Sequence, residues 1–369
     1  MEVYSKKLFN EINQKKFVII YGAGKTAERL IDLLEKLPYR VNILCCAVTN
    51  MDDNPNNCRG YQVRPITKLI KYNLNSLVLI ATTDKVQKEI MIKLKRHNFP
   101  FVSISSESQE MENLCIDYIA HFFRKQGRKY IFLENEQSNS KKNITIFMVK
   151  NHNDKKTMMP YELPDYMTPL QVGKYFTKIN LEGEKDNSGE NISFKNKEYC
   201  ELTGTFWIWK NLEKIKSKYV GLCHYRRWFD FRKIQQFIND DIDVILTTPI
   251  VNLPNVVTIY EEDHEKEDWL VMMEVLKKLE PNYYQTAIKY FSGTFYYGYN
   301  MIIAKKRIFN EYCEWLFPIL YETELRCKGK DSIYQNRYIG FLGEHLTGLF
   351  FWHNFEKYKI VHSKRIFLK

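Results

Sequence analysis

The segment YVGLCHYRRW (residues 219–228) joins an apolar run, typical of a buried strand, directly to a cationic and hydrogen-bonding cluster. In open α/β sheets, ligands bind beyond the carboxyl ends of the strands. One His and two Arg at such a strand end suit a phosphorylated ligand, because a guanidinium group matches phosphate oxygens bidentately. The segment therefore predicts an α/β fold with an anion-binding site at the end of this strand.

The same cluster supplies candidate catalytic cations. Because side chains alternate along a strand, we expect His224 and Arg226 on one face, and Tyr225 and Arg227 on the other. At least one Arg should then point toward a bound ligand and neutralise the charge that develops on a leaving group. The alternative is a structural network in which the Arg residues pair with carboxylates.

A second block, DNSGENISFKNKEYCELTGTFWIWKN (residues 186–211), predicts a polar loop that enters a helix. Its large apolar residues recur at spacings of three and four, so they form the buried face of that helix. A sugar-stacking role for Trp207 or Trp209 is the less favoured alternative. Asn191, Ser193 and Asn196 precede the helix and exceed what one N-cap needs, so they are candidate ligands for a sugar or nucleotide. Glu201 and Thr205, one turn apart on another face of the helix, join them as candidate substrate-binding residues.

A third block, GFLGEHLT (residues 340–347), places Glu344 beside glycines and ahead of an apolar helix. This carboxylate is the candidate functional group of the block, because it can exchange a proton. The competing interpretation is a Glu at a helix start, stabilised by the helix dipole. Asn300 follows the Tyr- and Gly-rich segment 295–299, where it could bind sugar hydroxyls or simply form a turn.

These blocks occur in a specific order between about residues 143 and 355: NIS, KN, YCELTG and W.WKN, then Y.GLCHYRR, then NM, then GFLGEH. The pattern resembles a family of bacterial glycosyltransferases found in capsular polysaccharide, exopolysaccharide and O-antigen gene clusters. The resemblance implies a GT-A-like α/β domain that takes a sugar from a nucleotide-diphosphate sugar. It suggests a UDP-activated hexose, with galactose in pyranose or furanose form as a candidate, and a lipid-linked saccharide as acceptor.

The resemblance also assigns roles to single residues. Inverting transfer needs one carboxylate to accept the proton of the attacking hydroxyl. Glu344 matches the family's third block, which makes it the candidate catalytic base or acceptor-binding carboxylate. Tyr225 joins the substrate-binding residues because it lies inside the cationic cluster. The rival function is a non-catalytic sugar-nucleotide sensor, which would bind the same ligand without turning it over.

A metal site is less clearly indicated. Many enzymes with a GT-A fold hold Mn²⁺ or Mg²⁺ on an Asp-x-Asp motif that ends a strand. Here Asp243 belongs to an Asp-Ile-Asp sequence that precedes an apolar run, so Asp230, just beyond the cationic cluster, is the better-placed single ligand. His264 could contribute to metal or substrate binding. We favour a metal-independent mechanism in which the His and Arg cluster takes the cation's place.

The amino-terminal region contains a separate nucleotide-binding signature. The apolar run FVIIY (residues 17–21) leads through GAGKTA into a helical pattern, which places Gly22, Gly24 and Lys25 in a G-x-G-x-x-A turn. No acidic residue ends the next strand, which disfavours NAD. The region resembles the Rossmann-like domains attached to bacterial sugar-modifying enzymes, and a sugar nucleotide is the implied ligand. A glycine turn kept only for strand–helix packing is the alternative.

Alternating strands and helices predict a small parallel sheet for this first domain. The polar run at 134–142 then separates a Rossmann-like nucleotide-binding domain at 1–140 from the GT-A-like domain at 141–369.

Composition narrows the partners of this 369-residue chain. Its formal net charge is +11 and 15% of its residues are aromatic, which would suit nucleic acid, an anionic membrane or stacked sugars. The basic residues are scattered and match no nucleic-acid recognition module, so we expect no nucleic acid partner. Without a long apolar run or a signal-peptide pattern, we expect a cytoplasmic protein, peripheral on the anionic inner face of the membrane through five C-terminal cations: Lys357, Lys359, Lys364, Arg365 and Lys369.

Overall fold

The computed structural model describes residues 4–106, 108–133, 143–154, 163–230 and 241–368. The chain divides into two compact units, Met1–Tyr130 and Ile131–Lys369. This division falls ahead of the join that we expected near residue 140, because Phe132 forms a parallel bridge with His362 and so belongs to the second unit. The expected join itself lies in 134–142, outside the described residues.

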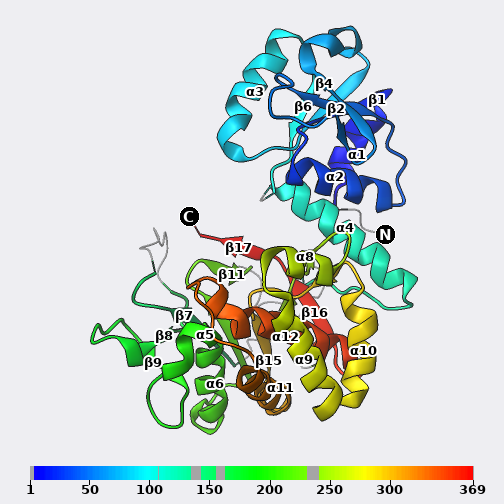
Figure 1. The fold of residues 1–369 in the computed structure, drawn as a ribbon. Coiled ribbons are helices and arrows are strands. Elements are labelled where there is room, and N and C mark those ends of the chain that lie inside the picture. The colour runs from blue at the N-terminus through cyan, green and yellow to red at the C-terminus, as the bar shows by residue number, and fades with distance from the viewer. Residues whose placement is uncertain (1–3, 107, 134–142, 155–162, 231–240, 369) are drawn as a thin grey trace. The chain divides into compact units, whose positions relative to one another are not determined.

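The first unit is an α/β domain on a six-stranded sheet with the strand order β3-β4-β2-β1-β5-β6 (Figure 1). In chain order its helices and strands are α1 Lys6–Asn13, β1 Phe17–Tyr21, α2 Lys25–Lys36, β2 Ile43–Val48, β3 Asn57–Cys58, β4 Tyr61–Pro65, β5 Ser76–Ile80, α3 Asp84–Arg96, β6 Phe101–Ser103 and α4 Gln109–Lys125. The apolar runs form β1, β2, β5 and β6, which pair in parallel, as the alternating pattern predicted.

In the turn after β1, packing requires a glycine at one of the two glycine positions. Gly22 has φ +134°, and a Cβ there would lie 2.5 Å from the carbonyl oxygen of Ala81 at the end of β5. Gly24 begins α2 and has open space where a Cβ would be, and Lys25 beside it is exposed. Strand packing alone therefore accounts for Gly22, whereas it does not account for Gly24.

The second unit is a mixed α/β domain on a nine-stranded sheet whose main path runs β16-β12-β15-β10-β7-β8-β9 (Figure 1). Its elements are β7 Ile144–Lys150, β8 Met167–Gln171, β9 Glu184–Lys185, α5 Asn196–Tyr199, α6 Leu202–Lys210, β10 Tyr219–His224, β11 Arg227–Phe229, β12 Val244–Thr247, β13 Ile250–Val251, α8 Val256–Asp263, α9 Lys266–Leu279, α10 Pro281–Phe291, β14 Phe295–Tyr296, β15 Ile302–Lys305, α11 Lys306–Arg326, α12 Tyr338–His353, β16 Ile360–Ser363 and β17 Arg365–Phe367. This architecture fits the GT-A-like class that the sequence predicted.

The central strands bring two loops to one edge of this sheet. β7 and β10 pair in parallel over six residues, and β15 runs antiparallel on the other side of β10. The carboxyl ends of β7 and β10 therefore lie side by side. Helix α12 is buried along most of its length and packs against α10 and α11, which explains its almost uninterrupted apolar sequence.

The end of β10 differs from our expectation. The strand stops at His224, Tyr225 and Arg226 form a two-residue turn, and the chain returns antiparallel as β11. His224 and Arg227 are directly opposed partners across this hairpin. Opposed residues share a face, so the predicted alternation that separated His224 from Arg227 was wrong. The hairpin instead puts the imidazole and one guanidinium on the same side.

Candidate functional site

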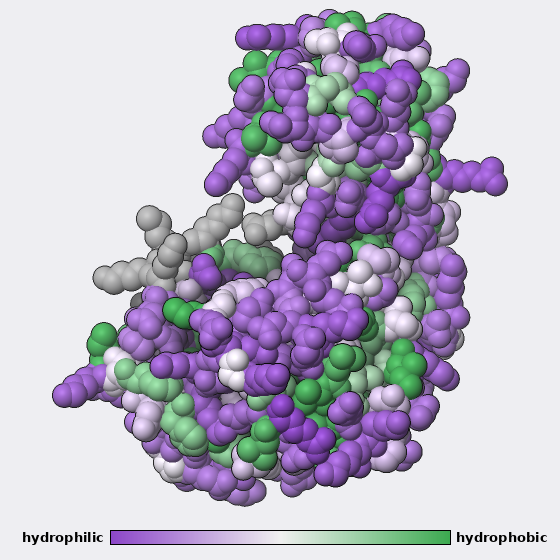
Figure 2. All heavy atoms as spheres, viewed as in Figure 1, coloured by the Kyte–Doolittle hydropathy of each residue, from purple (hydrophilic) through white to green (hydrophobic). Residues whose placement is uncertain are grey.

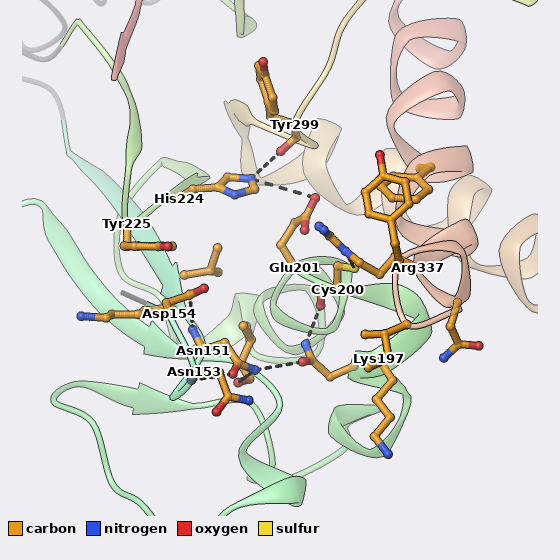
Figure 3. A pocket seen from close by; sticks show the side chains of 18 of the residues that line it. Asn151, Asn153, Asp154, Lys197, Cys200, Glu201, His224, Tyr225, Tyr299 and Arg337 are labelled. Atoms are coloured by element: carbon orange, nitrogen blue, oxygen red, sulfur yellow. Dashed lines mark hydrogen bonds and ion pairs between the residues drawn. The ribbon is translucent and has the colours of Figure 1, made fainter. Parts of the chain in front are cut away.

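A cavity of about 970 Å³ lies at the carboxyl ends of β7 and β10 (Figure 3). Its walls come from the loop after β7, the β10–β11 hairpin, α5 and the break before α6, the segment between α11 and α12, and the first turns of α12. Seven residues that we selected from the sequence line it: Asn196, Glu201, His224, Tyr225, Arg226, Arg227 and Glu344. Segments far apart in the chain therefore meet where the strand-end rule predicted a ligand.

The cationic side chains of the cavity wall lie over aromatic rings. The guanidinium carbon of Arg227 lies 4.5 Å from the ring centroid of Tyr299, and that of Arg226 lies 5.1 Å from the ring of Tyr225. Lys150, at the end of β7, places its Nζ 5.7 Å from the same Tyr225 ring. Among the described residues, the buried Nε of Arg227 has no hydrogen-bond partner. A donor held on an aromatic face with an unused N–H is suited to an anionic ligand.

His224 is held between the two sides of the cavity. Its Nε2 lies 2.6 Å from the carbonyl oxygen of Tyr299 and 4.0 Å from Oε1 of Glu201 (Figure 3). Burial lowers the pKa of His224, although the Glu201 charge opposes that change. The neutral ring therefore donates its Nε2–H to Tyr299, which leaves Nδ1 as a hydrogen-bond acceptor.

Glu201 and Glu344 form a carboxylate pair in the same cavity as the arginines, close enough for the charge of Glu201 to act on Glu344. Burial, followed by the negative charge of Glu201, raises the pKa of Glu344 to about 8. A hydrogen bond with the Tyr299 backbone and the charges of Arg227 and Arg337 oppose this rise. A carboxyl group whose pKa is raised by burial and by a neighbouring carboxylate is a common arrangement for acid–base chemistry.

Asn300 lies outside the cavity lining and contacts Glu201 of this pair. It is 1% exposed, and its Nδ2 donates to Oε1 of Glu201 at 2.8 Å and to the carbonyl of Gly340 at 3.2 Å. Asn300 does not line the cavity, so its contacts position Glu201 and leave no amide for a sugar hydroxyl. The substrate-binding role expected for Asn300 is therefore replaced by a positioning role.

Three non-glycine residues at this site have positive φ. Cys200 has φ 52° and ψ −129°, Tyr299 has φ 72°, and Asn300 has φ 49°. Each precedes or contacts a group of the site: Cys200 comes before Glu201, Tyr299 bonds His224, and Asn300 bonds Glu201. Such conformations cost on the order of 1–3 kcal/mol each and concentrate at functional sites. Cys200 also separates α5 from α6, so the polar loop of the second block enters two short helices and not the single helix that we expected.

The loop before α5 is held by the fully buried carboxylate of Asp186. It accepts hydrogen bonds from the backbone of Gly173 and Lys174, from Ser193 Oγ at 2.5 Å and from Thr203 Oγ1 at 2.7 Å. Ser193 is thus buried structure and not a substrate ligand, because its hydroxyl is already used. The cluster fixes the shape of this side of the cavity.

The remaining polar residues of the second block divide between the cavity and the scaffold. Asn196 lines the cavity, but its amide binds Cys200, Thr203 and Asn151. Asn191 lies outside the cavity and closes a turn through its contacts with the backbone of residues 189 and 193, which contradicts the expected binding role. Thr205 is buried in α6 away from the cavity.

Trp207 is buried, Trp209 is half-buried and neither lines the cavity, which agrees with the favoured interpretation. Trp207 donates to Ser188, and Trp209 stacks on Phe317 at 5.5 Å.

Glu344 lies inside α12 and not ahead of it. This position rules out the helix-start interpretation, because six residues of α12 precede it. The glycines of the third block allow close packing: a Cβ at Gly340 would lie 3.1 Å from the sulfur of Cys200, and one at Gly343 would lie 2.5 Å from Leu202. They bring α12, and Glu344 with it, against the start of α6.

The candidate metal ligands do not come together. Asp243 accepts a hydrogen bond and ion pair from Lys305 Nζ at 2.7 Å and a bond from the backbone of Lys359. Asp230 is buried and His264 stacks on Phe341 at 4.1 Å, and neither lines the cavity. In the described ranges no group of three or more His, Cys, Asp or Glu is arranged to hold a metal ion. These residues do not fit a metal centre.

Sequence reasoning missed several cavity residues. Asp154 lies in the loop after β7, Tyr299 in the turn before β15, and Lys330 and Arg337 between α11 and α12. Arg337 donates through Nε to Cys200 Sγ at 3.1 Å and so sits beside the carboxylate pair. The sole sequence signal for Asp154 was its place after a strand, and the 330–337 segment offered none.

The sequence of this chain matches the model of a known protein family. The model of a domain of unknown function, DUF4422, matches residues 146–356, which is more than half of the chain. The chain belongs to this family. A comparison with curated proteins found no match.

The DUF4422 chain is also similar to a solved glycosyltransferase, the apo structure of the bifunctional enzyme WbbM. The TM-score is 0.56 and the identity 25%, over 62% of this chain and 45% of that one. The chain thus spans less than half the length of WbbM. This likeness supports a relationship with glycosyltransferases.

Proposed function

We propose that the second unit is a glycosyltransferase that moves a sugar from a nucleotide-diphosphate sugar to a hydroxyl of an acceptor saccharide. One observation carries this proposal: a single cavity is lined both by Arg226 and Arg227 and by Glu201 and Glu344. The likeness to WbbM supports the reaction class. A volume of about 970 Å³ suits a ligand of nucleotide-sugar size.

Different groups of the cavity wall suit different parts of the nucleotide-sugar donor. Amide and carboxylate groups of the loop after β7, Asn151 to Asp154, suit the base and ribose hydroxyls. Arg226, Arg227 and Lys150 suit the diphosphate, because their charges are grouped at the hairpin. This order leaves the sugar between the cations and the carboxylate pair.

The proposed reaction is a single displacement. The acceptor oxygen forms a bond to the anomeric carbon while the bond from that carbon to the diphosphate oxygen breaks. The acceptor's proton passes to Glu344, and the negative charge on the leaving diphosphate is neutralised by Arg227 and Arg226. Neutral His224 accepts a hydrogen bond at Nδ1 and orients a sugar or acceptor hydroxyl.

The elevated pKa of Glu344 gives this mechanism a pH signature. A base works in its ionised form, so turnover should rise with pH through about 8. Replacing Glu201 by Gln removes the like charge that raises the pKa of Glu344, so the midpoint should move to lower pH. A midpoint that stays in place would remove Glu201 from this role.

We propose that no divalent cation is needed for leaving-group stabilisation. The Asp243 carboxylate is occupied by Lys305, and Asp230 lies off the cavity, so neither is placed to bridge a metal and the diphosphate. The arginines supply the positive charge instead.

The finer assignments follow the sequence resemblance. We propose a UDP-hexose donor, with galactose in pyranose or furanose form as the first to test, and a lipid-linked saccharide acceptor in bacterial surface polysaccharide synthesis. The acceptor would place the enzyme at the inner face of the cytoplasmic membrane. In the described part of the chain, no helix is both long and apolar enough to cross a membrane.

A panel of nucleotide sugars tests this proposal directly. Each donor is incubated with the full chain, first alone and then with a saccharide acceptor, and products are identified by mass. Donor-dependent thermal stabilisation together with a glycosylated product is expected. Stabilisation without hydrolysis or transfer for any donor would favour a sensor that binds the sugar nucleotide without turning it over.

A further inference from the structure

Exposed rings gather on the rim of the cavity, on the side formed by β8, β9 and α5. Tyr175 is 65% exposed and Phe194 is 50% exposed, and their ring centroids lie 6.1 Å apart. Phe176 is exposed beside them, 5.3 Å from Tyr175, and lines the cavity itself. Figure 2 shows hydrophobic spheres among hydrophilic ones on this side of the second unit. We call Tyr175, Phe176, Phe194 and the neighbouring exposed Ile179 the aromatic rim.

The rim is built into the fold. The turn that carries Tyr175 and Phe176 is fixed by the buried Asp186, and the backbone N–H of Tyr175 donates to Ser193 Oγ at 3.1 Å. Large apolar side chains on such an anchored turn stay exposed because the scaffold holds them there. Exposed apolar groups clustered beside a binding cavity mark an interaction surface.

Lysines among the rings indicate what this surface contacts. Lys197 is exposed and places its Nζ 4.7 Å from the Phe176 ring centroid, and it lines the cavity too. Lys178 is exposed within the same segment. Aromatic rings combined with lysines that extend along them are typical of groups that lie at the headgroup level of a bilayer.

We propose that the aromatic rim docks the protein on an anionic lipid bilayer, with Tyr175 and Phe194 entering the headgroup region. The proposal rests on the glycosyltransferase function, because it brings the cavity mouth to the surface where a lipid-linked acceptor would be held. Phe176 belongs to both the aromatic rim and the cavity lining, and Lys197 lines the cavity 4.7 Å from its ring, so an acceptor would pass directly from the rim into the cavity.

This surface differs from the basic C-terminus that the sequence suggested. Lys357 is paired with Glu311 at 2.8 Å, and the guanidinium of Arg365 donates to the carbonyl of Thr248. Those cations are engaged in the fold. Glu182 and Glu184 are also exposed in this region. We therefore expect the rings to supply most of the attachment and the lysines to supply the preference for anionic lipid.

Sedimentation with phosphatidylethanolamine–phosphatidylglycerol vesicles tests the rim. The double variant Tyr175→Ser/Phe194→Ser should bind at least tenfold more weakly than the wild-type full chain. The matched control Leu270→Ser/Ile288→Ser removes side chains that are 49% and 50% exposed on α9 and α10, and it should bind within twofold of wild type. Neither Tyr175 nor Phe194 lines the cavity, so donor turnover in solution should be unchanged in the test variant.

The outcomes separate the possible failures. Equal vesicle binding by wild type and the rim variant, or no binding by wild type, overturns the proposal. Binding that disappears at about 1 M salt, where the Debye length is about 3 Å, would show attachment by charge and also overturn it. A dimer that the rim variant abolishes, without vesicle binding, would assign the surface to a second copy. Transfer to a soluble acceptor tests the glycosyltransferase function independently of all these results.

Discussion

Replacing Glu344 by Gln should change how stability depends on pH. The pKa of Glu344 rises from an ordinary 4.5 to about 8 in the folded protein, because burial and the Glu201 charge disfavour its ionised form. The folded state therefore binds this proton more tightly than the unfolded state does. The contribution of the protonated Glu344 to the free energy of unfolding is complete below about pH 4.5, and it is lost as the pH rises through about 8. Gln keeps the neutral shape at every pH, so the variant should lack this loss.

The size of the effect follows from the change in pKa. Each pKa unit corresponds to about 1.4 kcal/mol, so ionisation of Glu344 costs the folded state up to about 5 kcal/mol. Urea unfolding at steps between about pH 5 and 9 measures the free energy of unfolding of both proteins. As the pH rises, the free energy of unfolding of Glu344→Gln should increase relative to that of wild type by several kcal/mol. The exposed control Glu262→Gln should show no such increase. A constant difference between variant and wild type across this range would refute the reasoning.

The same variant separates binding from chemistry, and three further predictions concern the rest of the site. Glu344→Gln should abolish transfer yet leave donor affinity nearly intact, and full activity would remove Glu344 from the mechanism. Of Arg226→Ala and Arg227→Ala, at least one should lose about 10²-fold or more in turnover, and near-normal kinetics in both would contradict the charge-neutralising role. Activity should persist in chelator, whereas complete loss restored by Mn²⁺ would transfer that role to a metal. Asp186→Asn should lower the free energy of unfolding by about 3 kcal/mol, since several buried donors lose a charged acceptor, and an unchanged urea midpoint would show that the loop does not depend on it.

Much of the fold follows from apolar runs. The predicted strand at 17–21 and the apolar run that begins at 219 are present as β1 and β10, because short apolar runs bounded by turn or polar residues are typical of buried strands. The end of β10 was not predictable in the same way. Its hairpin turn consists of Tyr225 and Arg226, and neither carries the Gly or Asn signal on which turn prediction depends.

The sequence predicted single residues of the candidate site, but it did not predict which of them contact one another. His224, Arg227, Glu201 and Glu344 were each chosen for their chemistry and their place in one of the three sequence blocks, and all four line one cavity. Their pairing depends on packing between distant segments, which no local pattern reports. The Asn300 contact with Glu201 shows this most clearly, because a buried amide aimed at a carboxylate has the same sequence signature as one that faces a ligand.

The three strained residues explain how such a site stays in place. Cys200, Tyr299 and Asn300 would relax to ordinary φ if their surroundings allowed it, and relaxation would move Glu201 and the carbonyl that holds His224. Close packing of α12, made possible by Gly340 and Gly343, presses against the Cys200 turn and prevents that movement. The glycines of the third block therefore serve the site through the scaffold. They allow two carboxylates from distant parts of the chain to approach closely enough that one alters the protonation of the other.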